Sequence, residues 1–426
     1  MSDETPAKKE LAAIKGTKDI LPGEVEVWQT VEAETRRLVE LYGYRELRAP
    51  VIEPTELFEK GTGETTDIVT KEMYTFTDKG GRSITLRPEY TPSMARAILE
   101  HRLDLRPEPM RYYYMGPMFR YDKPQKGRYR QFHQLDIEIF NEKDPAIDAE
   151  IIEMADALLR TLGVQGTETL MNSVGCRACR PAYLRDLRVH AEKVRDRLCP
   201  DCRRKITTNP LRIFDCKVEG CREQAARFPK ITATLCPECR EHFEQVCSYL
   251  DLYKVAYRIE PNLVRGLDYY TKTTFEIVSV GLGAQNALLG GGRYDDMMKD
   301  FGGPDICGIG FAMGLERLIS ILNVKPEKKK VLYIAYMGDD GKRRGVELAR
   351  FFRRNGIGCL VEFGNKGFKA QFGRANKLGA AWVLIIGEDE IRKGLYQLKD
   401  MAAGTQTGGT AEDLLKIIRK KDGDMS

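Results

Sequence analysis

Apolar positions in the first 160 residues change repeatedly between a helical and a strand period. Apolar residues recur at near-helical spacing over residues 24–42 and predict a helix there, at Val27, Val31, Leu38 and Leu41. Short strand-like runs follow over residues 45–51, 73–77 and 83–86. Helices and strands therefore both contribute to the N-terminal part of the fold.

The clearest alternation runs through residues 119–139, FRYDKPQKGRYRQFHQLDIEI, where two strand-like runs flank a basic loop. Successive side chains of a strand face opposite ways, so Gln134, Asp136 and Glu138 share one face and the apolar residues between them line the other. The polar face forms a fixed floor of acceptors. The loop concentrates positive charge, with Asp122 as its only acid, and predicts an anionic ligand. Its basic residues are Arg120, Lys123, Lys126, Arg128 and Arg130.

Helix starts and a second group of strands complete the predicted N-terminal domain. Asp144 followed by Pro145 is an N-cap with proline at the first helical position, and predicts a helix to about residue 162. Another helix follows Thr91. From residue 263 the pattern gives strands at 273–280 and 286–289, then a helix with an apolar stripe. Because no regular βαβ rhythm appears, the predicted class is α+β with a largely antiparallel sheet.

The segment from 163 to 260 differs in composition and is interpreted as a helical insertion, because it holds nine of the eleven cysteines. Eight of them form four pairs with metal-ligand spacing: Cys176 and Cys179, Cys199 and Cys202, Cys216 and Cys221, Cys236 and Cys239. Eight thiolates could hold two structural Zn²⁺ ions; the alternative is a set of ordinary free cysteines. Cys247, Cys307 and Cys359 stand alone and are expected to be packing residues.

Residues 325–330, with a proline and three lysines, are a predicted linker. Strands over residues 331–336, 358–363 and 381–386 then alternate with helices over 342–354 and 368–378. We therefore predict a domain over residues 1–325, including the insertion, and a compact α/β domain over 326–426. The second domain has 20 Lys or Arg against 13 Asp or Glu. That surplus indicates either a polyanionic partner or a solvated lysine-rich surface.

Composition and length fit a soluble multidomain protein, with 426 residues, 42% apolar and 31% charged. No apolar run reaches the roughly 18–20 residues of a membrane span, and the first ten residues are unlike a signal peptide, so the cytoplasm is expected. The chain has no P-loop motif, and Gly308, Gly310 and Gly314 miss the dinucleotide-binding spacing by one residue. Arginines would have to hold any bound triphosphate.

Six ordered motifs resemble signatures of class II aminoacyl-tRNA synthetases, and among them of the bacterial histidyl-tRNA synthetases. They are GTKDILP (16–22), TLRPEYT (85–91), FRYDKPQKGRYRQFHQ (119–134), LVRGLDYYTKTTFE (263–276), GGGRYDDM (290–297) and GFAMGLERL (310–318). The resemblance covers nearly the whole chain. It implies an antiparallel six-stranded sheet flanked by helices, a C-terminal anticodon-binding domain, an insertion on the acceptor side of the tRNA, and a homodimer built partly on the first motif's helix.

The resemblance also implies a ligase reaction. Histidine and ATP would give histidyl-adenylate and pyrophosphate, and the terminal ribose hydroxyl of the histidine tRNA would then attack the activated carbonyl. Arg120 would grip the α-phosphate, and Arg265 would be a second catalytic phosphate arginine where other class II enzymes use a metal ion. Arg317 would stack on adenine and contact the γ-phosphate. Mg²⁺ is expected with the ATP.

The amino-acid site is likewise implied by the resemblance. Glu138 would meet the imidazole of histidine, with Tyr270 at the other ring nitrogen. The polar backbone groups of the amino acid would be held by Glu89, Thr91 and Gln134. Tyr269 is also a candidate, but because it adjoins Tyr270, strand alternation predicts that only one of the two faces the pocket.

On the basic loop, Gln125 and Arg128 match positions that the family uses to read the extra guanine–cytosine pair of the tRNA acceptor end. The alternative is a solvated loop without base contacts. Asp122 and Lys123 stand where many relatives have glutamate and arginine. The charge signs persist, but Lys123 cannot make a forked contact.

Two other functions remain open at this point. A regulatory paralogue would resemble the synthetase-like subunit of ATP phosphoribosyltransferase, which senses histidine without making an adenylate. Such proteins lack the anticodon-binding domain and erode the three arginines, all of which this chain retains. The second alternative is a zinc-bearing nucleic-acid-binding protein with an idle synthetase fold. Retained tRNA binding without ATP-dependent charging would identify it.

Overall fold

The computed structural model describes residues 11–64, 66–125, 127–282, 286–324, 330–364 and 366–422. The chain divides into two compact units, Met1–Pro326 and Glu327–Ser426. The predicted linker lies outside the described residues except for Lys330.

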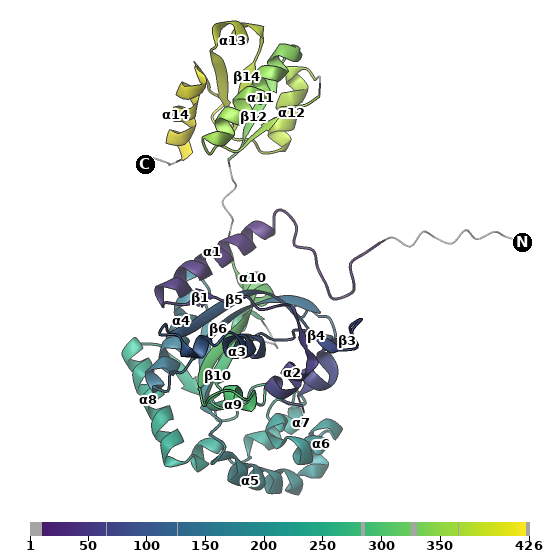
Figure 1. Ribbon diagram of the computed structural model, residues 1–426, viewed down its shortest axis with the longest axis vertical. Helices are drawn as coiled ribbons and strands as arrows, with labels where there is room; N and C mark the ends of the chain where they lie inside the picture. Colours follow the sequence, from purple (N-terminus) through teal and green to yellow (C-terminus); the bar gives the residue numbers. More distant parts are fainter. Residues whose placement is uncertain are drawn as a thin grey trace, which may run out of the picture. The chain divides into compact units, whose positions relative to one another are not determined.

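The first unit is built on an eight-stranded sheet (Figure 1). In spatial order its strands are β1 (Arg45–Glu46), β5 (Met110–Phe119), β6 (Gln131–Phe140), β11 (Gly308–Gly314), β10 (Ala287–Arg293), β9 (Thr271–Ser279), β7 (Thr167–Ser173) and β8 (Tyr257–Ile259). The six strands from β5 to β7 pair antiparallel, whereas β1 and β8 pair parallel at the two edges. The expected six-stranded antiparallel sheet is therefore confirmed as the centre of a wider one.

Helices cover the two faces of this sheet unequally. On one face lie α1 (Val25–Leu41), α4 (Pro145–Thr161), α8 (Pro237–Tyr253) and α10 (Leu315–Ile321), whose apolar residues share one buried core with the sheet. A second core under α3 (Thr91–Glu100) and α9 (Met297–Asp300) covers part of the other face. The remainder of that second face is where the candidate site lies.

The predicted elements before residue 163 are largely present. Asp144 caps α4 by accepting from the Ala146 N–H at 2.9 Å, as the Asp-Pro pair predicts. The strand predicted over 45–51 is wrong in extent, because only the two residues of β1 pair and Pro50 brings no N–H to a ladder. A small separate sheet has the order β2 (Ile52–Pro54), β4 (Ser83–Leu86), β3 (Tyr74–Thr77), with α2 (Thr55–Thr62) beside it.

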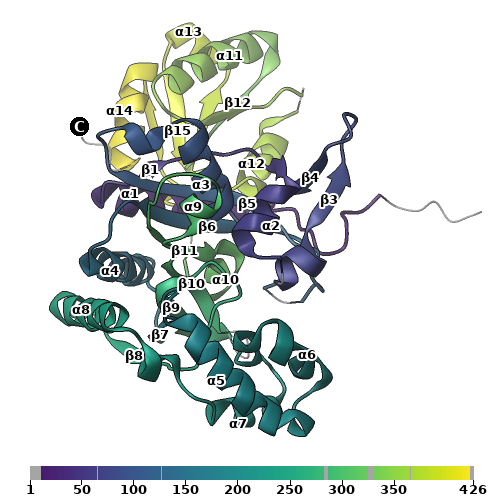
Figure 2. The ribbon, with the colours of Figure 1, turned by 60° about the horizontal axis from the view of Figure 1, so that its bottom comes forward.

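The cysteine-rich insertion is helical, as predicted. Besides α8 it contains α5 (Arg180–Lys193), α6 (Pro200–Thr208) and α7 (Glu219–Ala226). Figures 1 and 2 show α5, α6 and α7 grouped at one end of the unit, whereas α8 returns to pack beside α4. The group has a small apolar core of its own, into which several cysteines are packed.

The second unit is an α/β domain with a five-stranded sheet. Its strands in spatial order are β13 (Cys359–Val361), β12 (Leu332–Tyr336), β14 (Trp382–Ile386), β15 (Tyr396–Asp400) and β16 (Gln406–Gly409). Its helices are α11 (Gly338–Arg354), α12 (Phe368–Lys377), α13 (Glu388–Lys393) and α14 (Ala411–Asp422). The predicted elements up to residue 386 are present, and the antiparallel hairpin β15–β16 and the last two helices extend them.

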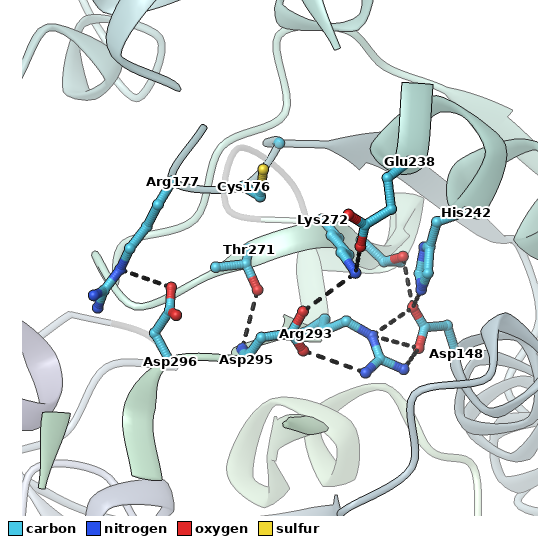
Figure 3. A network of polar contacts seen from close by, with 12 residues as sticks. Asp148, Cys176, Arg177, Glu238, His242, Thr271, Lys272, Arg293, Asp295 and Asp296 are labelled. Carbon is cyan, nitrogen blue, oxygen red and sulfur yellow. Dashed lines mark hydrogen bonds and ion pairs between the residues drawn. The ribbon is translucent and has the colours of Figure 1, made fainter. Parts of the chain in front are cut away.

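A buried ion pair joins α4 to the end of β10 (Figure 3). The Arg293 Nε atom lies 3.0 Å from Asp148 Oδ1, and both side chains are at most 1% exposed. Thr273 of β9 donates its hydroxyl to Asp148 Oδ2 at 2.7 Å. Removing one partner of such a pair typically costs about 3–5 kcal/mol, because the other charge is left buried and unpaired. The pair therefore locks β9, β10 and α4 together.

The same network reaches the insertion. Lys272 Nζ lies 3.6 Å from Asp295 Oδ2 and 3.0 Å from Glu238 Oε1 at the start of α8. The Asp295 N–H donates to the Thr271 hydroxyl at 3.0 Å. Because Tyr294 lies between Arg293 and Asp295, this network fixes the backbone that presents Tyr294 to the candidate site. Within the described ranges, no helix is both long and apolar enough to cross a membrane.

Candidate functional site

A cavity of about 510 Å³ opens over β6, β10 and β11 on the face that the core helices leave free. That size is typical of small-molecule sites. Gln134, Asp136 and Glu138 form part of its lining, while Leu135 and the alternate residues of β6 are packed in the core. The alternation predicted for this strand is confirmed.

The floor is deep because the neighbouring strand carries a glycine. Gly310 lies opposite Glu138 in the β6–β11 pairing. A Cβ atom at Gly310 would stand 1.7 Å from Glu138 Oε2, so only glycine leaves room for this carboxylate. The first glycine of the GFAMGLERL motif is therefore needed to leave space for the Glu138 carboxylate.

Glu138 accepts hydrogen bonds from two hydroxyls. Thr91, at the start of α3, and Tyr294, after β10, each donate to one of its oxygens. Burial raises the pKa of Glu138 to about 8, against the opposing effect of these two donors. The carboxyl is therefore poised to change charge near neutral pH.

Two further carboxyls line the same cavity as Glu138. Glu89 accepts from the hydroxyls of Thr62 and Tyr269, the latter at 3.0 Å. Burial raises the pKa of Glu89, and burial followed by the charge of Glu138 raises that of Asp136 well above its usual value. Three crowded carboxyls favour a ligand that brings a positive charge or N–H donors.

Glu89 is held by the turn that leads into α3. The buried Arg87 side chain donates to the carbonyl oxygens of Pro117 at 3.1 Å and Ala49 at 3.0 Å.

On β6, no donor among the described residues reaches Gln134 Oε1 or Asp136 Oδ2. These two buried acceptors fit an ammonium or imidazole N–H.

The lining of the cavity is also cationic. Arg120, Arg265 and Arg317 all line it, although they lie in three distant stretches of sequence. Arg120 Nε donates to the Pro88 carbonyl at 2.8 Å, and its guanidinium lies over the Phe132 ring at 5.3 Å. The predicted convergence of the three guanidinium groups on one cavity is therefore present.

The guanidinium of Arg265 lies over Gly290 of β10. Its Nη1 is 3.2 Å from Glu276 Oε1 of β9. A Cβ at Gly290 would stand 2.1 Å from the Arg265 guanidinium, so the first glycine of the GGGRYDDM motif makes room for this side chain. Glu276 and Gly290 together fix the position of the Arg265 guanidinium.

Arg317 is anchored by backbone acceptors, its Nε donating to the Gly127 carbonyl at 3.2 Å and its Nη1 to the Ala287 carbonyl at 3.0 Å. Glu316 beside it accepts from the His133 N–H at 2.9 Å and so ties α10 to β6. Burial, and after it the nearby guanidiniums of Arg128 and Arg120, lower the pKa of Arg317. Like charges crowded in this way favour an anionic ligand.

The two adjacent tyrosines correct one expectation. Tyr269 and Tyr270 both line the cavity, whereas strand alternation predicted only one. The prediction was wrong because both lie in the turn before β9, where a period of two does not apply. The two rings contact each other at a centroid distance of 4.7 Å.

Arg128 and Gln125 of the basic loop are placed differently. Arg128 lines the cavity and pairs with Asp122 at 2.7 Å, while Gln125 is exposed and outside the lining. Their backbones bond to each other, with the Arg128 N–H donating to the Gln125 carbonyl at 2.8 Å. Lys126 lies outside the described residues.

The sequence analysis missed several lining residues, among them one tyrosine and three residues of the insertion. Tyr294 belongs to a motif that was recognised, but its role as a donor to Glu138 had no local signal. Arg212, Asp215 and Lys217 come from the insertion and also line the cavity. Nothing in the spacing of these three indicates that the insertion folds back toward the site.

The eight paired cysteines form two groups of four. Within each group the sulfur atoms all lie within 4.8 Å of one another, and all eleven cysteines of the chain are free thiols. The first and last pairs combine, as do the two middle pairs: Cys176, Cys179, Cys236 and Cys239; Cys199, Cys202, Cys216 and Cys221.

The geometry of both groups suits a tetrahedral metal. The Sγ–Sγ distances are 3.7 Å for Cys176 and Cys179, and 3.9 Å for Cys199 and Cys216. A zinc ion with Zn–S bonds of about 2.3 Å would set its sulfurs about 3.8 Å apart. Arg180, directly after Cys179, donates to the Tyr270 carbonyl, so the first group also borders the cavity wall.

Comparison with known proteins gives a consistent result. The family model described as histidyl-tRNA synthetase matches residues 16–196 and 202–318, and one described as anticodon binding domain matches residues 331–421. The chain is 46% identical over 416 residues to a histidine–tRNA ligase of Halothermothrix orenii, covering 96% of this chain and 99% of that one.

Solved structures agree with these matches. The apo histidyl-tRNA synthetase of S. aureus is similar with a TM-score of 0.81 at 35% identity, over 96% of this chain and 99% of that one. A Bacillus halodurans protein titled ATP phosphoribosyltransferase regulatory subunit/histidyl-tRNA synthetase has a TM-score of 0.62 at 19% identity, over 87% and 96% of the two chains. This second likeness concerns the fold alone.

Proposed function

The chain belongs to the histidyl-tRNA synthetase family, and we propose that its cavity forms histidyl-adenylate between the carboxyl floor and the three arginines. The activity is that of a histidine–tRNA ligase, with residues 331–421 as the anticodon-binding domain. The observation that carries the proposal is the convergence of Arg120, Arg265 and Arg317 on a cavity floored by Glu138.

The part of the cavity lined by the three arginines is the proposed site of ATP. Arg120 and Arg265 hold the α-phosphate, and Arg317 contacts the adenine and the γ-phosphate. In the reaction a carboxylate oxygen of histidine attacks the α-phosphorus of ATP. The bond between the α-phosphorus and the oxygen that bridges it to the β-phosphate breaks, and pyrophosphate leaves with the electron pair of that bond. Fixed guanidinium groups stabilise the charge that spreads over the phosphoryl oxygens. Mg²⁺ bound to the substrate ATP neutralises part of the triphosphate charge.

The part of the cavity lined by the three carboxyls is the proposed site of histidine. Glu138 accepts from one imidazole nitrogen, with Tyr270 at the other. Glu89, Thr91 and Gln134 hold the polar groups around the α-carbon, and the buried free acceptor on Gln134 suits the α-ammonium group. Tyr269 and Tyr294 act through the carboxyls to which they donate.

The macromolecular contacts extend the same scheme. Arg128 and Gln125 meet the acceptor end of the histidine tRNA, and the place of Arg128 in the cavity lining supports this. The enzyme works as a homodimer in which α1 contributes to the interface. The cytoplasm is its proposed location, since eleven free thiols suit a reducing compartment.

The regulatory alternative is less supported. A histidine sensor needs neither an anticodon-binding domain nor three phosphate arginines around the floor, and this chain has both. The 19% identity to the protein with the regulatory title shows no shared activity.

Each four-cysteine group is proposed to hold one structural Zn²⁺ ion. The sulfur separations support this, as does the small core of α5, α6 and α7, which has few large apolar residues to stabilise it. The ions would add stability to the insertion.

The ligase assignment is tested by histidine-dependent exchange of pyrophosphate into ATP. We expect exchange with histidine by the full chain, and Arg265→Ala should lower kcat/KM for ATP by about 10²- to 10³-fold, typical of losing a preset charge at the reacting phosphate. Arg258→Ala, at an exposed arginine of β8, is the matched control and should stay within two-fold. Equal effects of the two substitutions would contradict the role of Arg265.

The pKa of Glu138 gives a pH dependence. Below about pH 8 the free enzyme carries Glu138 protonated, and as the pH rises the carboxylate forms and accepts the imidazole N–H. The kcat/KM for histidine should therefore rise about 25-fold from pH 6.5 to 8.5. Glu138→Gln should lower kcat/KM and flatten this rise, and it also controls for titration of histidine itself. A variant profile parallel to the wild type would argue against Glu138.

Metal content tests the thiolate groups. Protein purified with zinc should contain two equivalents by elemental analysis, one for each group. Cys239→Ser and Cys221→Ser should each remove one equivalent, because three thiolates hold zinc less firmly than four. Cys247→Ser, at a lone cysteine of the same insertion, should remove none. Fewer than two equivalents in the wild type, or equal loss with Cys247→Ser, would refute the assignment.

A further inference from the structure

The insertion contributes a wall to the cavity. Arg212, Asp215 and Lys217 line the cavity, and all three lie in the connection between α6 and α7. This connection contains a short 3-10 helix, Pro210–Ile213, whose Ile213 is fully buried in the core of the insertion. The wall is therefore firmly seated on the insertion.

The four-cysteine group Cys199, Cys202, Cys216 and Cys221 closes this connection at both ends. Two of its members precede the 3-10 helix and two follow it. The Cys199 N–H donates to the Cys221 sulfur at 3.1 Å, across the base of the connection. A metal bound to the four sulfurs would fix the length and direction of the segment that carries Arg212.

Arg212 reaches from this segment to the backbone beside Arg265. Its Nη2 donates to the Gly266 carbonyl at 2.5 Å and to Asp268 Oδ1 at 3.0 Å, and its side chain is only 13% exposed. Asn209 donates to the same Asp268 oxygen at 3.0 Å. The segment Leu263–Asp268 belongs to no helix or strand, so individual hydrogen bonds rather than a ladder hold it.

The catalytic body holds the two ends of that segment. Asn172 of β7 donates to the Leu263 carbonyl at 2.9 Å, and the Asp268 N–H donates to the Thr62 carbonyl of α2 at 3.3 Å. Between these ends, the Gly266 carbonyl accepts from Arg212 of the insertion. Arg265 itself has the Glu276 ion pair, which fixes its tip, while Arg212 fixes the backbone one residue after it. Two anchors from different parts of the chain thus define the position of one guanidinium.

We propose that Arg212 is a positioning residue for Arg265, and that the four thiolates holding its segment make the affinity for ATP depend on metal in the insertion. The inference deepens the proposed function and rests on the nucleotide role of Arg265. A charged donor to a backbone carbonyl and a carboxylate is among the stronger hydrogen-bonding groups of a protein, so its loss frees the segment. Misplacing a phosphate ligand even slightly weakens nucleotide binding.

The test measures ATP binding to the full chain by calorimetry, without histidine, beside metal content and the two KM values in the exchange assay. Arg212→Ala should raise the Kd for ATP about ten-fold, leave the KM for histidine within two-fold, and leave both metal equivalents in place. Arg212→Lys keeps the charge but cannot fork between the Gly266 carbonyl and Asp268, so its effect should be intermediate. Arg204→Ala, an exposed arginine of α6, is the control and should bind ATP normally.

Cys216→Ser tests the link to the metal. It should lose one metal equivalent and raise the Kd for ATP to the same extent as Arg212→Ala, and combining the two substitutions should add little. Normal ATP affinity in Arg212→Ala, equal rises of both KM values, or metal loss in Cys216→Ser without weaker ATP binding would each overturn the proposal. A failed exchange reaction with the predicted ATP shifts would refute the proposed function alone.

Discussion

Charged groups of both signs that share one cavity are the constraint on which the rest of the site depends. Three buried carboxyls and three guanidinium groups line it together. Burial makes each group costly unless a ligand of the opposite character completes it. Histidine supplies N–H donors to the carboxyls and ATP supplies phosphate charge to the guanidinium groups, so the two substrates meet in one cavity.

Several parts of the fold hold these charged groups in place. Glycines on β10 and β11 leave the space that Arg265 and Glu138 occupy, so the sheet backbone itself determines where both charges sit. The buried pair of Asp148 and Arg293 locks the strands beneath and presents Tyr294 to Glu138. From the other side the insertion supports the walls through Arg212 and Arg180. The site is thus held by groups that touch no substrate.

The sequence predicted what depends on local periodicity and on short motifs. The two faces of β6, the cap at Asp144 and the spacing of the cysteine pairs all follow from neighbours within a few residues. The partition of the cysteines could not be predicted, because it depends on how α8 returns to the sheet. The two tyrosines misled the alternation argument because a turn, not a strand, carries them. Arg212 gave no signal, since its partner Gly266 lies 54 residues away.

The most direct test of this account is a crystal structure of the full chain with histidine and a non-hydrolysable ATP analogue. In that structure we expect the imidazole within hydrogen-bond distance of Glu138, the α-phosphate between Arg120 and Arg265, and the adenine against Arg317. A triphosphate bound away from these guanidinium groups, or an imidazole turned from the carboxyl floor, would contradict it.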